Sequence, residues 1–163
     1  MKYKYILFDL DGTITESGPG IMNSVEYALN KMNREVGERD TLKKFIGPPL
    51  TESMEKYYGM SEEEALLGVK YYREYYAVKG IFENSVYEGL AETLESLENE
   101  GYILAVATSK PEEYAKRIAD KFDFAKYFAG IYGATMDGSL IRKADVIRAS
   151  TTSMPASATF FWI

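Results

Sequence analysis

Cysteine and histidine are both absent from this chain of 163 residues. Their absence excludes disulfide bonds, zinc sites built from thiolate or imidazole ligands, cysteine nucleophiles and Ser-His-Asp triads. Any catalysis must therefore rely on carboxylates, hydroxyls, lysine, arginine, backbone amides or a hard metal ion bound by oxygen.

Basic surface and long apolar runs are lacking as well. The chain has 19 basic and 25 acidic residues, and its net charge of −6 leaves no electrostatic footprint for nucleic acid. No stretch approaches the roughly 18 apolar residues that a membrane-spanning helix needs. Residues 1–10 do not have the pattern of a secretory signal. We therefore expect a cytoplasmic protein that binds no nucleic acid polymer and no membrane.

The apolar and turn-forming residues predict an α/β fold. Strand-like apolar runs alternate with segments whose apolar residues recur at helical spacing, which favours a Rossmann-like parallel sheet with helices on both faces. The runs typical of buried strands are residues 5–8, 102–107, 131–133 and 159–163.

The segment between the first two of these strands is predicted to be entirely helical. It contains four tyrosines between positions 71 and 76, which are more typical of packing between helices than of base stacking. We therefore divide the chain into an α/β core of residues 1–15 and 82–163 and a small all-α domain of residues 16–81, inserted after the first strand.

Polar residues follow two of the predicted strands at the point where each strand ends. Asp9, Asp11 and Gly12 come directly after the first strand, and Thr108 and Ser109 follow the second. Ligands of open α/β sheets bind at the carboxyl ends of the strands, so the two segments form one candidate site. Hydroxyls and free backbone N–H groups ahead of a helix also bind anions readily.

The two aspartates indicate a metal ion. Asp9 and Asp11 are separated by one residue, and two carboxylates this close repel each other unless a cation or a shared proton relieves them. Mg²⁺ binds through one or two carboxylates together with the phosphate oxygens of a substrate, and it is the cofactor that we expect. An isolated Asp-Gly pair would be a simple hairpin turn, but the whole run 8–13 after an apolar strand favours the site.

These segments resemble the first three motifs of the haloacid dehalogenase superfamily. The matching residues are Phe8-Asp9-Leu10-Asp11-Gly12-Thr13, Ala107-Thr108-Ser109-Lys110 and Lys143. The helical insertion resembles the small α-helical cap of that superfamily, and the likeness is strongest to its phosphoglycolate phosphatase-like branch. Within this branch, the segment 45–50 resembles a group described as 5′-nucleotidases.

The resemblance implies a Mg²⁺-dependent phosphatase that hydrolyses a small phosphate monoester, such as phosphoglycolate or a nucleoside 5′-monophosphate. Asp9 would be the nucleophile that forms an aspartyl-phosphate, and Asp11 would act as general acid and then as general base. Asp9 and the backbone carbonyl of Asp11 would also hold the Mg²⁺ ion, and Lys143 would neutralise the charge of the transferring group. The phosphate-binding residues would be Gly12, Thr108, Ser109 and Lys143.

The resemblance also implies how the helical insertion takes part. As a cap it would close over the site, exclude water and select the substrate, with residues 47–49 as a contact loop. The expected partner is a small phosphorylated metabolite, bound by a monomer or a homodimer.

Other functions remain open at this point. A phosphomutase would use every residue named above, and a catalytically inactive binding protein would not need a complete metal site. A dehalogenase is disfavoured because its chemistry does not use the second aspartate, Asp11. A phosphoacceptor receiver domain is disfavoured because its acceptor follows a middle strand and it has no helical insertion.

The fourth motif of the superfamily has no counterpart in this sequence. That motif places one or two further aspartates after a late strand, whereas residues 149–163 contain no charged residue. We expect the natural sequence to continue beyond this point and to supply the missing carboxylates. An intact mass well above 18.4 kDa would support this expectation.

Overall fold

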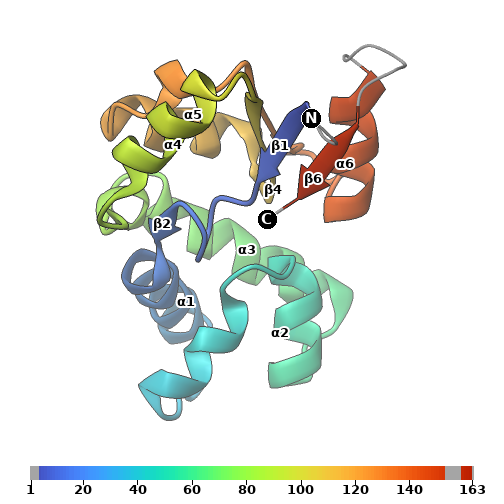
Figure 1. The fold of residues 1–163 in the computed structure, drawn as a ribbon. Coiled ribbons are helices and arrows are strands. Elements are labelled where there is room, and N and C mark those ends of the chain that lie inside the picture. Colours follow the sequence, from blue (N-terminus) through green and yellow to red (C-terminus); the bar gives the residue numbers. More distant parts are fainter. Residues whose placement is uncertain (1–3, 153–158, 163) are drawn as a thin grey trace. The chain divides into compact units, whose positions relative to one another are not determined.

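The structure, a computed structural model, describes residues 4–152 and 159–162, and the chain forms two compact units (Figure 1). The core unit consists of Met1–Thr15 and Val86–Ile163, and the helical unit consists of Glu16–Ser85. The sequence analysis placed the second boundary after residue 81, whereas the structure places it after Ser85.

A four-stranded parallel sheet in the order β5-β4-β1-β6 forms the centre of the core unit. Tyr5 of β1 is paired with Ile103 of β4 on one side and with Phe160 of β6 on the other. The predicted α/β fold with a parallel sheet is therefore confirmed. The strands are β1 (Tyr5–Phe8), β4 (Ile103–Pro111), β5 (Gly130–Ala134) and β6 (Phe160–Trp162).

Three helices cover this sheet. Helix α5 connects β4 to β5 and α6 follows β5, and both pack against β4 and β5. Crossovers between parallel strands are right-handed. The chain adds β4 and then β5 on one side of β1 but returns to the other side of β1 for β6, so α6 lies on the face opposite α4 and α5, as Figure 1 shows. The helices are α4 (Leu90–Asn99), α5 (Glu112–Lys121) and α6 (Lys143–Thr152), with a short 3₁₀ turn, η3, at Ala125–Tyr127.

The strands of the sheet are apolar because helices cover both of its faces. All four residues of β1 are buried, and 104–107 of β4 are at most 1% exposed. Strands covered by helices on both faces are continuously apolar rather than alternating. This covering makes the ends of the strands the places where polar groups of the sheet can reach a ligand.

The helical unit contains three α-helices and two 3₁₀ helices. Its elements are α1 (Gly18–Lys31), η1 (Arg39–Phe45), α2 (Leu50–Tyr58), α3 (Glu62–Tyr76) and η2 (Gly80–Phe82). Helix α3 packs against both α1 and α2. The short strands β2 (Thr15–Glu16) and β3 (Ser85–Val86) pair where the chain passes between the units.

Aromatic packing and one close backbone approach hold the helical unit together. Tyr72 and Tyr76 of α3 are buried and stack with ring centroids 5.1 Å apart, which confirms the packing expected for these tyrosines. Gly20 of α1 lies so close to Gly80 that a Cβ atom at Gly20 would overlap the Gly80 carbonyl group. Within the described part of the chain, no helix is long and apolar enough to span a membrane.

Candidate active site

The turn after β1 holds both candidate catalytic aspartates. Oδ1 of Asp9 accepts a hydrogen bond of 2.8 Å from the backbone N–H of Leu10, which orients the carboxylate at the strand end. The carbonyl of Leu10 then accepts the backbone N–H groups of residues 13–15 and closes the turn. Gly12 permits this turn because its φ of +79° lies in the left-handed region. Asp9 and Asp11 therefore both lie at the carboxyl end of β1.

Lys143 comes to the same place from the first turn of α6. Its ammonium donates to Oδ2 of Asp9 and forms an ion pair with it, although 134 residues separate the two in sequence. The Lys143 side chain is 28% exposed and that of Asp9 is 15% exposed, so the pair is accessible to a small ligand. The structure thus brings the expected nucleophile and the expected charge-neutralising lysine into contact.

Thr108 and Ser109 lie at the carboxyl end of β4, the strand beside β1. Their segment was expected to be a loop, but β4 continues to Pro111, and its register with β5 shifts between Ala107 and Pro111. Thr108 is buried, its Oγ1 accepts the backbone N–H of Lys110 at 3.2 Å, and Ser109 is half-buried. Irregular strand ends of this kind redirect side chains near active sites.

Gly12 has a conformational role in the turn. It is exposed, and its N–H donates to the carbonyl of Thr15 at 2.8 Å. The contribution of Gly12 that the structure describes is therefore the left-handed turn that follows Asp11.

A second lysine, Lys110, pairs with the second aspartate. Lys110 Nζ lies 3.1 Å from Oδ1 of Asp11, and their side chains are only 5% and 8% exposed. Lys110 ends the sequence motif 107–110, but the sequence alone gave it no role among the site residues. The sequence does not reveal that Lys110 is buried, because a lysine just before a helix is ordinarily solvated.

The donor set at the end of β1 is compatible with Mg²⁺. This ion usually binds through one or two carboxylates and keeps waters or substrate phosphate oxygens as its other ligands. The carboxylate of Asp9 and the backbone carbonyl of Asp11 are the two protein oxygens that could bind it there. Within residues 4–152 and 159–162, no group of three or more acidic, Cys or His side chains is gathered that could hold a metal ion. The fit is therefore to an ion that shares its coordination with substrate, not to a closed protein cage.

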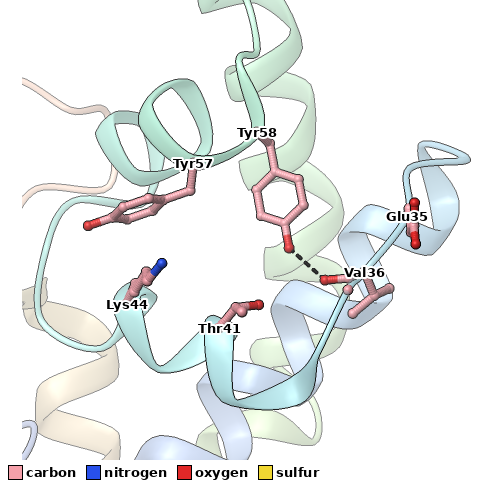
Figure 2. A pocket seen from close by; sticks show the side chains of 7 residues that line it. Glu35, Val36, Thr41, Lys44, Tyr57 and Tyr58 are labelled. Atoms are coloured by element: carbon pink, nitrogen blue, oxygen red, sulfur yellow. Dashed lines mark hydrogen bonds between the residues drawn. The ribbon is translucent and has the colours of Figure 1, made fainter.

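The helical unit has a pocket of its own, shown in Figure 2. Its volume is about 320 Å³, and it contains none of the candidate site residues. Lys44 Nζ lies 5.3 Å from the centroid of the Tyr57 ring, and the Tyr58 hydroxyl donates to the Val36 carbonyl at 2.9 Å. Burial raises the pKa of the Tyr58 phenol, so it remains a neutral donor.

Comparison with known proteins identifies the family. Residues 6–144 match the model of the haloacid dehalogenase-like hydrolases. This chain belongs to that family. The resemblance expected from the strand-end motifs is therefore confirmed, and the match extends across both units of this hydrolase.

Relatives of this hydrolase have several names. A 5′-nucleotidase from Pseudomonas aeruginosa is 43% identical over 148 residues, which are 91% of this chain and 67% of that protein. The tyrosine-protein kinase PtkA from Mycobacterium tuberculosis is 41% identical over 143 residues, which are 87% of this chain and 48% of that protein. The chain thus spans between about half and two thirds of these curated relatives.

A solved structure has the same fold. The crystal structure of a predicted phosphatase from Clostridium acetobutylicum superimposes with a TM-score of 0.94 at 44% sequence identity. The superposition covers 99% of this hydrolase and 76% of that chain.

Proposed function

We propose that this hydrolase cleaves small phosphate monoesters through a covalent intermediate on Asp9. The observation that carries the proposal is the contact between Lys143 and Asp9. A lysine at the start of a helix contacts an aspartate at the carboxyl end of a strand, which is where open α/β folds bind ligands. A nucleophilic carboxylate needs such a cation, because the attacked phosphate is itself an anion.

In the first step, a carboxylate oxygen of Asp9 attacks phosphorus, and the bond from phosphorus to the ester oxygen breaks. Asp11 gives its proton to the departing oxygen, so that an alcohol leaves rather than an alkoxide. The ammonium of Lys143 and the hydroxyl of Thr108 would bind the oxygens of the transferring group. The product of this step is an acyl phosphate on Asp9.

In the second step, water attacks the phosphorus of this intermediate. Asp11, now a carboxylate, takes a proton from the water, and the bond between phosphorus and Asp9 breaks. Inorganic phosphate leaves, and Asp9 returns to its carboxylate form. Asp11 ends the cycle protonated, as it began.

Mg²⁺ fits this scheme as the required metal. Asp9 through its carboxylate and Asp11 through its backbone carbonyl would hold it, which leaves the Asp11 side chain available for proton transfer, and when bound the ion supplies positive charge that reduces the repulsion between nucleophile and phosphate. The substrate class that we propose is a small monoester such as phosphoglycolate or a nucleoside 5′-monophosphate. We propose the helical unit as the cap that selects among such substrates.

The phosphoryl acceptor distinguishes the competing functions. Water as acceptor makes the protein a phosphatase, a second sugar hydroxyl makes it a phosphomutase, and a tyrosine hydroxyl would make it a kinase like the relative of that name. All three would share the intermediate on Asp9. A protein that forms no such intermediate would be the inactive binding protein considered from the sequence.

The test is hydrolysis of p-nitrophenyl phosphate with and without Mg²⁺. We expect turnover that requires Mg²⁺ and falls by at least about 1,000-fold in Asp9→Asn, since removing the nucleophile of a covalent mechanism leaves only residual catalysis. Asp123→Asn is the matched control: Asp123 lies in the same unit with φ of +57°, a conformation that asparagine also adopts. Undiminished turnover in Asp9→Asn would overturn the nucleophile assignment.

A further inference from the structure

The buried contact between Lys110 and Asp11 has no part in the mechanism described so far. We propose that Lys110 is a positioning residue that holds the acid–base carboxyl group of Asp11 in its working orientation. This inference rests on the proposed function, because it assigns Lys110 a role through Asp11 and not through the substrate.

The geometry of the pair assigns this role to one oxygen of Asp11. Lys110 Nζ approaches Oδ1 at 3.1 Å, and the two side chains are 5% and 8% exposed. Oδ1 is itself buried and, among the residues that the structure describes, accepts no hydrogen bond of good geometry. The ammonium of Lys110 therefore supplies the positive charge beside an oxygen that solvent does not reach.

Fixing Oδ1 leaves Oδ2 as the oxygen that exchanges protons. A general acid must deliver its proton along a short, well-aligned path to the leaving oxygen, and a small displacement of the carrier slows the reaction steeply. The side chain of Asp11 can rotate about two bonds. The contact of the Lys110 ammonium with Oδ1 can persist whether or not Oδ2 carries a proton, and it restricts both rotations and keeps Oδ2 directed to one place.

The backbone of Lys110 is held as firmly as its side chain. Its N–H donates to Oγ1 of Thr108, and the segment lies in the part of β4 where the register with β5 shifts. Lys110 lies near the carboxyl end of β4, an inner strand of the sheet, and is only 7% exposed. A lysine so placed and paired with a catalytic carboxylate is unlike the solvated lysines of the helices.

The experiment compares two leaving groups in Lys110→Met. The p-nitrophenolate ion leaves readily without a proton, whereas the alkoxide of phosphoglycolate needs one. We expect kcat/KM for phosphoglycolate to fall by about 100-fold, the loss that a misplaced catalytic group causes. For p-nitrophenyl phosphate we expect a loss below about 10-fold, because general-acid help contributes little there. A purely structural role would lower both by the same factor and would overturn the proposal.

Three further variants keep the result interpretable. Lys110→Arg retains the charge and should recover much of the phosphoglycolate activity. The double variant Asp11→Asn/Lys110→Met removes both charges. If Lys110 acts through Asp11, its ratio of kcat/KM for phosphoglycolate to kcat/KM for p-nitrophenyl phosphate should equal the ratio in Asp11→Asn alone. Lys116→Met is the matched control, because Lys116 forms an exposed ion pair with Glu112 in the same unit.

A crystal structure of Lys110→Met separates this inference from the proposed function. We expect the carboxyl group of Asp11 to be displaced or present in more than one rotamer. An Asp11 side chain that stays in place would overturn the positioning role whether or not the protein is a phosphatase. If the unaltered protein showed no turnover that depends on Asp9, in contrast, the proposed function would be wrong. The position of Asp11 in the Lys110→Met crystal structure would then still decide whether Lys110 positions Asp11.

Discussion

The ion pairs of the strand ends differ sharply from those of the helical unit. Lys110 and Asp11 are at most 8% exposed, and in the pair of Lys143 with Asp9 the more exposed side chain reaches 28%. Ion pairs of the helical unit are all more open than this. They include Lys31–Glu74, Arg34–Glu64, Arg39–Glu26 and Lys43–Asp40, in which no side chain is less than 34% exposed.

This difference indicates where charge serves chemistry and where it serves solubility. Exposed pairs contribute little to folding because water and salt screen them. Buried pairs also contribute little net stability, because the loss of hydration offsets the attraction. A fold that nevertheless places one buried and one partly buried lysine–aspartate pair at neighbouring strand ends gains a preorganised charged site, which is what phosphoryl transfer requires.

Lys143→Met is the variant with the largest expected effect among those that sharpen this contrast. Removing the cation from Asp9 should lower kcat for p-nitrophenyl phosphate by about 100- to 1,000-fold, as the loss of one stabilising donor does in other active sites. Steady-state kinetics measure the effect. The control is Arg148→Met, since Arg148 lies in the same helix and forms an exposed ion pair with Asp145. An equal loss in both variants would show that α6, not the charge of Lys143, is what matters.

Gly20→Ala should strongly destabilise the helical unit. A Cβ atom at Gly20 would overlap the backbone of Gly80, and the helix α1 must move away to accept it. We expect a loss of about 3 kcal/mol in the free energy of unfolding, at the upper end of overpacking effects. Urea denaturation measures it.

Gly18→Ala is the comparison for this prediction. A Cβ atom at Gly18 would meet the side chains of Glu16 and Ile46, which can move, and not a backbone carbonyl. We expect a change below about 1 kcal/mol. If the two alanine variants were equally stable, backbone contact between α1 and η2 would not be what holds the helical unit together.

The local pattern of the sequence predicted most of this fold. The four strands, the helix over 112–121 and the packing of the tyrosines follow from apolar runs and helical spacing, which are short-range signals. Helix α2 was predicted only as part of the helical segment 16–81 and not individually. In the structure Pro49 precedes the first residue of α2, and prolines are tolerated at helix starts.

The site could be predicted only in part. Asp9 and Asp11 are visible because their motif is specific and follows a predicted strand, whereas Lys143 was placed by the family resemblance alone. Lys110 was given no role because its buried contact with Asp11 joins the ends of β4 and β1, a long-range pairing that no local pattern contains. The contact of Lys143 with Asp9 likewise depends on the path of the chain through two crossovers, from β1 to β4 and from β4 to β5.

Asp137, in the connection from β5 to α6, offers a smaller effect at an exposed carboxylate. Hydrogen bonds from the backbone N–H and hydroxyl of Ser139 and from Thr135 lower the pKa of Asp137 to about 2. Because the folded pKa is below the unfolded one, this group favours folding above about pH 4, and the benefit is lost as the pH falls towards 2. NMR titration of the Asp137 carboxyl carbon measures the pKa, and Ser139→Ala should raise it. A pKa near the ordinary value would show that these hydrogen bonds do not persist in solution.

Glu74→Gln should have the smallest effect of all. The hydrogen bond from Lys31 lowers the pKa of Glu74, and the same contact raises the pKa of Lys31, but both side chains are open to solvent. Exposed pairs of this kind often contribute nothing measurable. We expect the melting temperature of Glu74→Gln at neutral pH to equal that of the unaltered protein, and to respond equally to added salt. A clear drop that disappears at high salt would mean that surface charge stabilises the helical unit, and the contrast between the two kinds of ion pair would then be one of degree.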